Sequence, residues 1–240
     1  IYKPKVRFLL DTLSDSFEQD KLVVDDYGCG GGHLVYAFNQ SGIFAKGFDV
    51  SKDLLDLGSS VWNDSNKFKN PPPFKLLKNE SQIIEEILKT KADVISFQGV
   101  LEHLRFPNKV FQSFKKSNAK FLYLSVPLFS LSVFIENVFS TVYPRQLGGA
   151  HTNLYTHDSL EYIFKKYNLS KVAEWIFGMD SLDLKRSLIS VGYKNEMSED
   201  ALSFFNDKIF TDEVLEEIQK VIDKSHSSSD THIILKKNKI

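Results

Sequence analysis

Short apolar runs of strand length alternate with segments of helical periodicity over the first half of the chain. The apolar runs lie at 22–27, 43–50, 74–77, 92–97 and 120–126. Between them, apolar residues recur three and four positions apart, which predicts helices at 6–17, 33–41, 51–60, 83–89 and 106–116. Strands that alternate with helices are typical of a parallel sheet with helical crossovers. The pattern therefore predicts an α/β fold, doubly wound and mostly parallel, with helices on both faces of the sheet.

The second half of the chain has fewer strands and longer helical stretches. Helices are expected at 131–142, at 158–167 with Thr156 as the cap, at 179–190 and at 200–224, the last interrupted near Phe210 and Thr211. Strands are expected at 171–177 and 231–236. The stretch 126–143 is apolar, but its 18 residues include a proline, a glutamate and an asparagine. It is too short and too polar to span a membrane.

Composition and charge narrow the classes of partner. The 240 residues are 42% hydrophobic and 25% charged, which is ordinary for one globular domain, and the net charge is −1. A near-neutral chain has no general field for a nucleic acid or an anionic membrane, so we expect neither as a partner. The single cysteine, Cys29, excludes an intrachain disulfide or a multi-cysteine metal site, which fits the cytoplasm. We expect no metal site.

A glycine-rich turn follows the first predicted strand. Four of the five residues from Gly28 to Gly32 are glycines, and such a turn lets the backbone approach a ligand closely. The next helix then offers free N–H groups. Asp49 lies 21 residues after Gly28, at the end of the second predicted strand, where a carboxylate can bind the hydroxyls of a ribose. The arrangement predicts a ligand that contains adenosine.

The spacing of the glycines separates two cofactor classes. Dinucleotide enzymes use G-x-G-x-x-G, which would need a glycine at position 33, where this chain has His33. With Asp26 included, residues 26–32 read D-Y-G-C-G-G-G and resemble the D-x-G-C-G-x-G motif of the class I S-adenosylmethionine-dependent methyltransferases. Residues 92–104 resemble the fourth strand and following loop of that family. The resemblance implies S-adenosylmethionine as the cofactor and a seven-stranded sheet whose last strand is antiparallel beside the fifth.

The same resemblance implies which residues bind the cofactor. The expected set is Asp26, Gly28, Cys29, Gly30, Gly32, Asp49, Val50, Gln98 and Gly99. For Cys29 we expect mainly a packing role in the loop. The residue that contacts adenine is left open among positions 78–80.

A second stretch carries the candidates for acceptor binding and catalysis. Residues 151–160 resemble the H-x-x-x-[FY]-[ST]-x-x-[ST]-L segment of a methyltransferase subgroup often linked to sugars, polyketides and other small molecules. His151 is the first candidate for a general base or an acceptor ligand, and His103 is the second. Arg145 and Tyr155 are candidates for binding the acceptor, and Arg145 would suit a phosphate or carboxylate on it.

The resulting hypothesis is a single methyltransferase domain over 1–240. It has a lid or acceptor-binding insertion at 128–155 and an extra helical segment at 179–225. We expect methyl transfer to a small molecule, with a sugar or sugar-linked precursor as one acceptor class and O-methylation favoured over N-methylation by a small margin. A homodimer is a possible assembly. The alternatives are a non-catalytic, methyltransferase-like partner subunit and an NAD-dependent oxidoreductase, which His33 disfavours.

Overall fold

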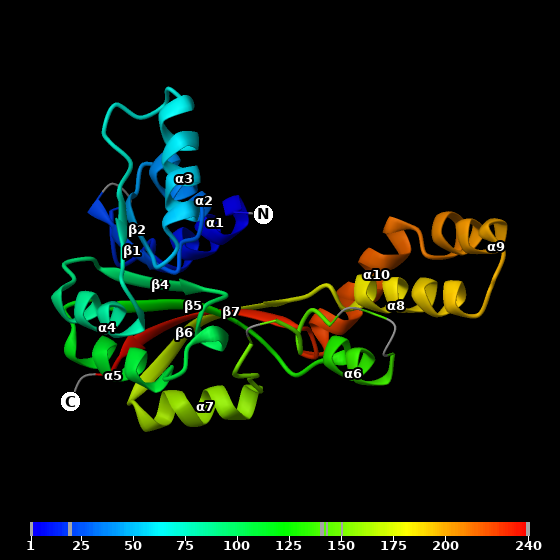
Figure 1. Ribbon diagram of the computed structural model, residues 1–240. Coiled ribbons are helices and arrows are strands. Elements are labelled where there is room, and N and C mark those ends of the chain that lie inside the picture. Colours follow the sequence, from blue (N-terminus) through cyan, green and yellow to red (C-terminus); the bar gives the residue numbers. More distant parts are fainter. Residues whose placement is uncertain (1, 19–20, 140–141, 143, 150, 239–240) are drawn as a thin grey trace. The chain divides into compact units, whose positions relative to one another are not determined.

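The chain folds into two compact units in the computed structural model, which describes residues 2–18, 21–139, 142, 144–149 and 151–238 (Figure 1). Unit 1 comprises 1–125, 161–174 and 232–240, and unit 2 comprises 126–160 and 175–231. The two segments expected as additions to the fold, 128–155 and 179–225, both lie within unit 2. The single domain over 1–240 stays a prediction.

The sheet has seven strands in the order β3-β2-β1-β4-β5-β7-β6. The strands are β1 (Val23–Tyr27), β2 (Phe44–Asp49), β3 (Phe74–Leu76), β4 (Val94–Gln98), β5 (Phe121–Pro127), β6 (Leu169–Phe177) and β7 (Asp230–Lys237). Strands β3, β2, β1, β4 and β5 pair in parallel, and β7 is antiparallel. The predicted fold class, with a mostly parallel sheet and an antiparallel last strand, is confirmed.

The register of the central strands aligns the ends that carry the predicted cofactor residues. Asp26 of β1 lies opposite Ser96 of β4 on one side and opposite Gly47 of β2 on the other. Because these strands run in parallel, their carboxyl ends meet at one edge of the sheet, where ligands bind in doubly wound folds. This edge carries the glycine turn, Asp49 and Gln98.

The helices of unit 1 form where amphipathic stretches can bury one face. They are α1 (Tyr2–Leu13), α2 (His33–Gln40), α3 (Lys52–Asp64), α4 (Glu80–Lys89), α5 (Asn108–Lys116) and α7 (His157–Lys166), the last beginning in unit 2. Apolar residues of α1 and α2, including Leu9, Val35 and Phe38, pack against Val24 of β1 and Val94 of β4 in the main core. The core thus fixes α2, which begins directly after the glycine turn.

Three aromatic rings stack across the middle of the sheet. Tyr27 lies between Phe48 and Phe97, with ring centroids 4.7 and 5.3 Å away and planes within 15° of parallel. The three residues occupy paired positions on β2, β1 and β4. Cross-strand aromatic pairs of this kind stabilise a sheet, here immediately before the turn that β1 enters.

The helix after β2 is longer than predicted. Ser51 caps α3 as expected, accepting from the N–H of Leu54, but the helix runs to Asp64 and not to 60. Trp62 explains the difference, because its side chain is only 3% exposed and its indole N–H donates to the carbonyl of Asn70 at 2.9 Å. Burial of this large ring stabilises a last turn that the polar sequence around it did not indicate.

Unit 2 consists mainly of helices. They are α6 (Leu131–Val138), α8 (Asp180–Lys194), α9 (Glu199–Phe204), the π turn η3 (Phe205–Ile209) and α10 (Asp212–Lys224). The predicted break near Phe210 and Thr211 is confirmed, and Thr211 caps α10. The ammonium group of Lys185 donates to the carbonyl groups of Asn206 and Phe210. The last carbonyl groups of a helix have no partner within the helix, and a lysine side chain can bind them.

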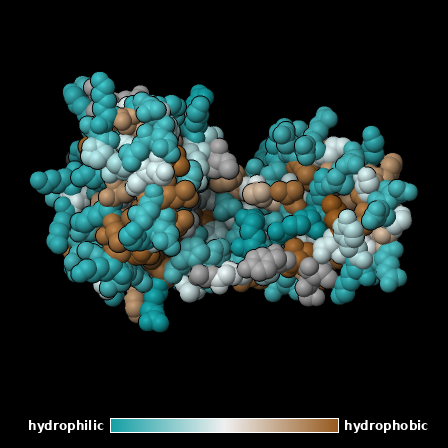
Figure 2. All heavy atoms as spheres, turned by 45° about the horizontal axis from the view of Figure 1, so that its top comes forward, coloured by the Kyte–Doolittle hydropathy of each residue, from teal (hydrophilic) through white to brown (hydrophobic). Residues whose placement is uncertain are grey.

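Large apolar side chains remain exposed on both units, as the brown patches of Figure 2 illustrate. In unit 2 they include Phe134, Tyr193, Phe204 and Val221, each at least 60% exposed. None of the helices within the described ranges combines the length and apolar content that crossing a membrane requires.

Candidate active site

The glycine turn after β1 depends on backbone conformations that favour glycine. Gly28, Gly30 and Gly32 have φ angles of +72°, +54° and +71°. At Gly28 a Cβ atom would lie 2.4 Å from the side chain of Val100, and at Gly32 it would lie 2.2 Å from the ring of Phe74. Larger residues would therefore be strained by conformation and by contact. The turn brings bare backbone to the carboxyl edge of the sheet.

Strand β2 and Asp49 hold this turn in place. The N–H groups of Gly28 and Cys29 donate to the carbonyl of Phe48 at 2.7 and 3.2 Å. The Asp49 carboxylate accepts from the N–H of Gly30 at 2.7 Å and from that of Ser51 at 2.8 Å, one on each oxygen. A carboxylate has about four acceptor positions, so among the described residues two of these remain. They suit the two hydroxyls of a ribose.

Asp26 is buried behind the turn and hydrogen-bonds to Ser96. Burial raises the pKa of Asp26 from 3.8 to about 7, while Ser96 and the positive charge of Lys5 oppose the rise. Its Oδ1 atom is buried without a hydrogen-bond partner in the described part of the chain. A buried orphan acceptor next to a ligand turn fits a bound donor such as the ammonium group of S-adenosylmethionine.

Gln98 ends β4 beside the turn and presents a second orphan acceptor. Its amide nitrogen donates to the hydroxyl of Ser96 at 3.3 Å and to the carbonyl of Tyr123 at 3.4 Å. Its amide oxygen is buried with no partner among the described residues. Gly99 follows with a φ of +68°, so the chain turns sharply at this point.

The remaining residues of the predicted cofactor set flank the turn. Val50 is 54% exposed directly after Asp49, where an apolar side chain can cover a ring. Cys29 is partly buried, and its Sγ atom would meet a Cβ at Gly47 at 2.6 Å, as expected for a packing residue. Burial, and then Asp26 and Asp49, raise the pKa of this thiol. It is therefore a poor nucleophile at neutral pH.

The segment after β3 contains positions 78–80, among which the sequence left open the residue that contacts adenine. The Asn79 side chain caps α4 by accepting from the N–H of Gln82 at 3.2 Å. The Glu80 carboxylate accepts from the N–H groups of Arg105 and Phe106 at 3.2 and 3.0 Å. Both side chains thus have structural partners. The bond from Glu80 also fixes the chain just after η2 (Leu101–His103), whose last residue, His103, is exposed.

Sequence reasoning assigned only packing to the first helix and missed Lys5. This residue of α1 is partly buried, and its charge acts on the pKa of Asp26. The sequence did offer a signal for this role. Lys5 lies one turn before the buried Leu9, on the side of α1 that packs against the rest of unit 1.

In unit 2, one buried carboxylate holds the loop that follows α6. Glu136 accepts from the N–H groups of Arg145, Gln146 and Leu147, with four N···O distances between 2.8 and 2.9 Å. Each carboxylate oxygen accepts twice. Sequence analysis did not identify this role, because a glutamate on an amphipathic helix is usually solvated.

The predicted acceptor ligand Arg145 is ion-paired within unit 2. Its guanidinium donates to Asp183 at 2.7 and 3.0 Å and to the hydroxyl of Ser229 at 3.0 Å, and it approaches Asp230 at 3.5 Å. Burial raises the pKa of Asp230 to about 6, against the opposing effect of Arg145. Asp180, fully buried nearby, accepts from the backbone of Ser132 and Ser229. Carboxylates of its own unit thus hold the guanidinium of Arg145.

His151 lies after the loop held by Glu136. Its Nδ1 atom is 2.9 Å from the carbonyl oxygen of Gln146. A carbonyl oxygen only accepts, so Nδ1 carries the hydrogen and, in the neutral ring, Nε2 carries the lone pair. Tyr155 is 5% exposed and pairs with Leu128 in an isolated parallel bridge. Thr156 caps α7 as predicted, accepting from the N–H of Ser159.

The structure thus brings the predicted cofactor residues together at one edge of unit 1. Arg145, His151 and Tyr155 lie in unit 2, and His103 lies in unit 1.

Comparisons with known proteins agree with this geometry. A family described as "Methyltransferase domain" matches residues 2–174. A search of curated proteins gives no match. Among solved structures, magnesium protoporphyrin IX methyltransferase from Synechocystis PCC 6803 with bound SAH has a TM-score of 0.58 at 17% identity, covering 74% of this chain and 78% of the other.

Two further structures cover nearly the whole chain. A putative sarcosine dimethylglycine methyltransferase from Galdieria sulphuraria has a TM-score of 0.58 at 12% identity and covers 98% of this chain and 85% of its own. A SAM-dependent methyltransferase from Archaeoglobus fulgidus has a TM-score of 0.55 at 18% identity and covers 98% and 94%. At these identities the likeness concerns the fold.

Proposed function

Because the chain belongs to the methyltransferase-domain family and is an S-adenosylmethionine-dependent methyltransferase, we propose that its acceptor is a small molecule with a reactive hydroxyl group. Sugars and sugar-linked precursors are the class favoured by the resemblance of residues 151–160. O-methylation is preferred over N-methylation because a histidine is available to take the hydroxyl proton.

The observation that carries this proposal is the hydrogen bond between His151 and Gln146. With Nδ1 donating to the carbonyl at 2.9 Å, the basic atom of the neutral ring is Nε2. This is the arrangement in which a histidine acts as a general base, since the backbone fixes both its tautomer and its ring orientation. His103 is the second candidate for this role, and Tyr155 and Arg145 are proposed to contact the acceptor.

On the cofactor side we propose distinct roles for the residues of unit 1. Asp49 binds the ribose with its two remaining acceptor positions, and the turn at 28–32 contacts the methionine part and ribose. Val50 covers the adenine, and Gly99 allows the close approach of the loop after β4. Asp26 and Gln98 accept hydrogen bonds through their orphan oxygens, and Lys5 suits the carboxylate of the methionine part.

The chemistry divides between cofactor and protein. Bound S-adenosylmethionine supplies a methyl group already activated by a positively charged sulfur. The chain has to exclude water and hold the acceptor oxygen in line with the methyl group, and such positioning can lower a barrier by about 7 to 11 kcal/mol. As the O–C bond forms and the C–S bond breaks to leave S-adenosylhomocysteine, His151 would take the proton of the acceptor hydroxyl on Nε2.

The test has a binding part and a turnover part. Calorimetric titration with S-adenosylhomocysteine, S-adenosylmethionine and NAD should show binding of the first two and none of NAD. An acceptor screen that begins with sugars, read as S-adenosylhomocysteine formed, should then give turnover that His151→Ala strongly reduces without changing cofactor affinity. Full activity of His151→Ala would remove His151 as the base.

A non-catalytic, methyltransferase-like partner subunit is the second candidate. The glycine turn and Asp49 support cofactor binding, and binding is common to both candidates. Tight binding of S-adenosylmethionine with no turnover across the acceptor screen would favour this alternative. The NAD-dependent oxidoreductase is disfavoured because His33 replaces the third glycine of the dinucleotide pattern.

We also propose that residues 128–155 act as a lid or acceptor-binding insertion and that the chain forms a homodimer. The exposed apolar side chains of unit 2, such as Phe134 and Phe204, support a surface that is covered in the assembly. Light scattering at several protein concentrations tests the dimer.

A further inference from the structure

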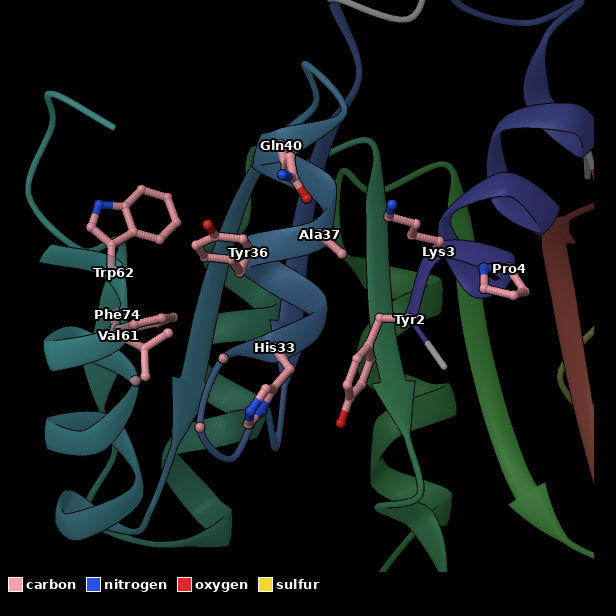
Figure 3. A pocket seen from close by; sticks show the side chains of 13 residues that line it. Tyr2, Lys3, Pro4, His33, Tyr36, Ala37, Gln40, Val61, Trp62 and Phe74 are labelled. Carbon is pink, nitrogen blue, oxygen red and sulfur yellow. The ribbon is translucent and has the colours of Figure 1, made fainter. Parts of the chain in front are cut away.

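A cavity of about 630 Å³ lies on the face of α2 that points away from the core (Figure 3). Helix α2 buries Leu34, Val35 and Phe38 against the sheet. Its other side presents Tyr36, Ala37 and other residues to the cavity. The first residues of α1, the second half of α3 and Phe74 of β3 complete the walls. Of the residues assigned above to the cofactor, Gly31 and Gly32 of the turn line it, and the others do not.

The walls of this cavity are aromatic and held in place by one another. Trp62 stacks on Phe68 with centroids 4.0 Å apart and meets the ring of Tyr36 edge-on at 6.1 Å. On the opposite wall the rings of Tyr2 and His33 stack at 5.4 Å with planes within 11° of parallel. Figure 3 shows Trp62 and Tyr36 to the left of Ala37, and His33 and Tyr2 below it. Rings fixed in this way form a binding surface at little further entropic cost.

The charge on the lining is of one sign. Among the described residues that line the cavity none is acidic, and Lys3 contributes an ammonium group. Gln40 adds an amide that can donate a hydrogen bond. The volume lies within the range of roughly 300 to 1,000 Å³ that is typical of small-molecule sites. Aromatic walls select a flat apolar body, and Lys3 selects an anion.

We propose that this cavity binds a flat, apolar organic molecule that carries an anionic group, and that its occupant changes the affinity for the cofactor. The second half of the proposal rests on the proposed function, because it requires S-adenosylmethionine at the other side of the glycine turn.

The coupling follows from the contacts of that turn. Gly31 and Gly32 line the cavity, and Gly58 of α3 lies so close that a Cβ on it would be 2.5 Å from the carbonyl oxygen of Gly31. The preceding residue, Gly30, donates to Asp49. An occupant that pushes on the turn from the cavity therefore shifts the backbone that positions Asp49. Coupling of this kind is reciprocal.

The probe for the test is 8-anilinonaphthalene-1-sulfonate, a flat aromatic anion, with uncharged N-phenyl-1-naphthylamine as its matched control. The reporter is the emission of Trp62 in a Trp175→Phe background, which leaves one tryptophan. Ala37→Phe fills the cavity, and Glu85→Phe adds the same ring to an exposed position on α4. Lys3→Gln removes the charge, and Lys69→Gln removes a charge from an exposed loop position.

We expect saturable quenching of Trp62 by the sulfonate in the parent protein. Ala37→Phe should weaken it by at least about ten-fold, equivalent to about 1.4 kcal/mol, while Glu85→Phe leaves it unchanged. Lys3→Gln should lower the affinity for the sulfonate roughly two- to five-fold, the range for an exposed charge pair. The affinity for the uncharged amine should not change. Circular dichroism confirms that each variant is folded. Quenching that is absent, or equal in Ala37→Phe and Glu85→Phe, would overturn the site.

The coupling is tested by titrating S-adenosylhomocysteine with and without saturating sulfonate. We expect its affinity to change, and the affinity for the sulfonate to change by the same factor when S-adenosylhomocysteine is bound. Unchanged affinities would overturn the coupling. If S-adenosylhomocysteine does not bind at all while the sulfonate binds as expected, the proposed function and the coupling fail and the ligand class of the cavity stands.

Discussion

Asp49 in unit 1 and Glu136 in unit 2 each hold a backbone loop, and the two carboxylates differ in how many acceptor positions they have left. Asp49 of unit 1 accepts from two N–H groups, one on each oxygen. Glu136 of unit 2 accepts from three, with two contacts on each oxygen. Since a carboxylate has about four acceptor positions, Asp49 keeps capacity for a ligand and Glu136 keeps none. The first is suited to binding, and the second to folding.

The two loops also differ in how their shape is specified. In unit 1 the glycines adopt conformations that other residues disfavour, so the backbone itself defines the turn. In unit 2 the loop at 144–149 is defined by charged side chains that reach it from α6, from α8 and from the start of β7. Substitutions that disturb the glycine turn should therefore affect ligand affinity most, and those that remove a charge around the loop at 144–149 should affect stability most.

The largest effect is expected for Arg145→Met in unit 2. The Asp183 side chain, 4% exposed, would lose its main partner and keep only the exposed Arg186, and removing one partner of a buried ion pair costs about 3 to 5 kcal/mol. Urea unfolding measures this loss. Arg186→Met is the matched control, because Arg186 pairs with the same aspartate from a position that is 42% exposed, where a pair is worth about 1 kcal/mol or less. Equal losses for both variants would contradict the buried ion pair.

Asp49→Ala should have the largest effect in unit 1, on ligand affinity. Loss of two hydrogen bonds to a charged group should weaken the binding of S-adenosylhomocysteine by about 3 kcal/mol, which is roughly 150-fold in affinity. Isothermal calorimetry measures the change. Asp53→Ala, an exposed position in the first turn of α3, should bind normally. Unchanged affinity of Asp49→Ala would rule out the ribose assignment.

Glu136→Gln is the counterpart of that variant in unit 2. The amide keeps one acceptor oxygen but places N–H donors against backbone donors, and we expect a loss of about 2 kcal/mol in the free energy of unfolding. Affinity for S-adenosylhomocysteine should stay the same. Glu217→Gln, an exposed position on α10, should change neither quantity. Weaker cofactor binding by Glu136→Gln without lower stability would reverse the roles assigned to the two carboxylates.

The smallest effect concerns the proton on Asp26. With a folded-state pKa of about 7, raised from 3.8 by burial, this carboxyl is about half protonated at neutral pH. Its contribution to stability is therefore present below pH 4 and lost as the pH rises through 7. A cationic ligand group favours the carboxylate, so binding of S-adenosylmethionine at pH 7 should release up to about half a proton.

Calorimetry in buffers of different ionisation enthalpy measures this release. Asp26→Asn has no proton to lose, so its binding enthalpy should not depend on the buffer through this group. Proton uptake by the parent protein, or a release that Asp26→Asn leaves unchanged, would contradict the assignment.

The contrast between the units also explains which features the sequence could predict. The glycine turn and Asp49 are recognisable because their spacing along the chain is dictated by one strand, one turn and the next strand. The network of Arg145, Asp183 and Asp230 joins positions up to 85 residues apart. Its members each look like ordinary surface charges in the sequence. Arg145 was accordingly proposed to contact the acceptor, and its ion pairs appear only in three dimensions.

The same limit applies to element boundaries and to α1. The end of α3 is fixed by burial of Trp62 against Phe68, which a helical pattern alone does not reveal. Lys5 matters because its charge acts on Asp26, a residue of another element. Local spacing predicted the order and type of the main elements, whereas contacts between distant charges decided how the loops of unit 2 are held.

Cys29 is a natural chemical probe of motion in the glycine turn. It is the one cysteine of the sequence, it is the second residue of the turn, and burial suppresses its thiolate. A thiol reagent should therefore react slowly with the native protein and faster whenever the turn opens. The rate at which a single absorbance signal develops would report those openings without any label or substitution, and a ligand that closes the turn would slow it.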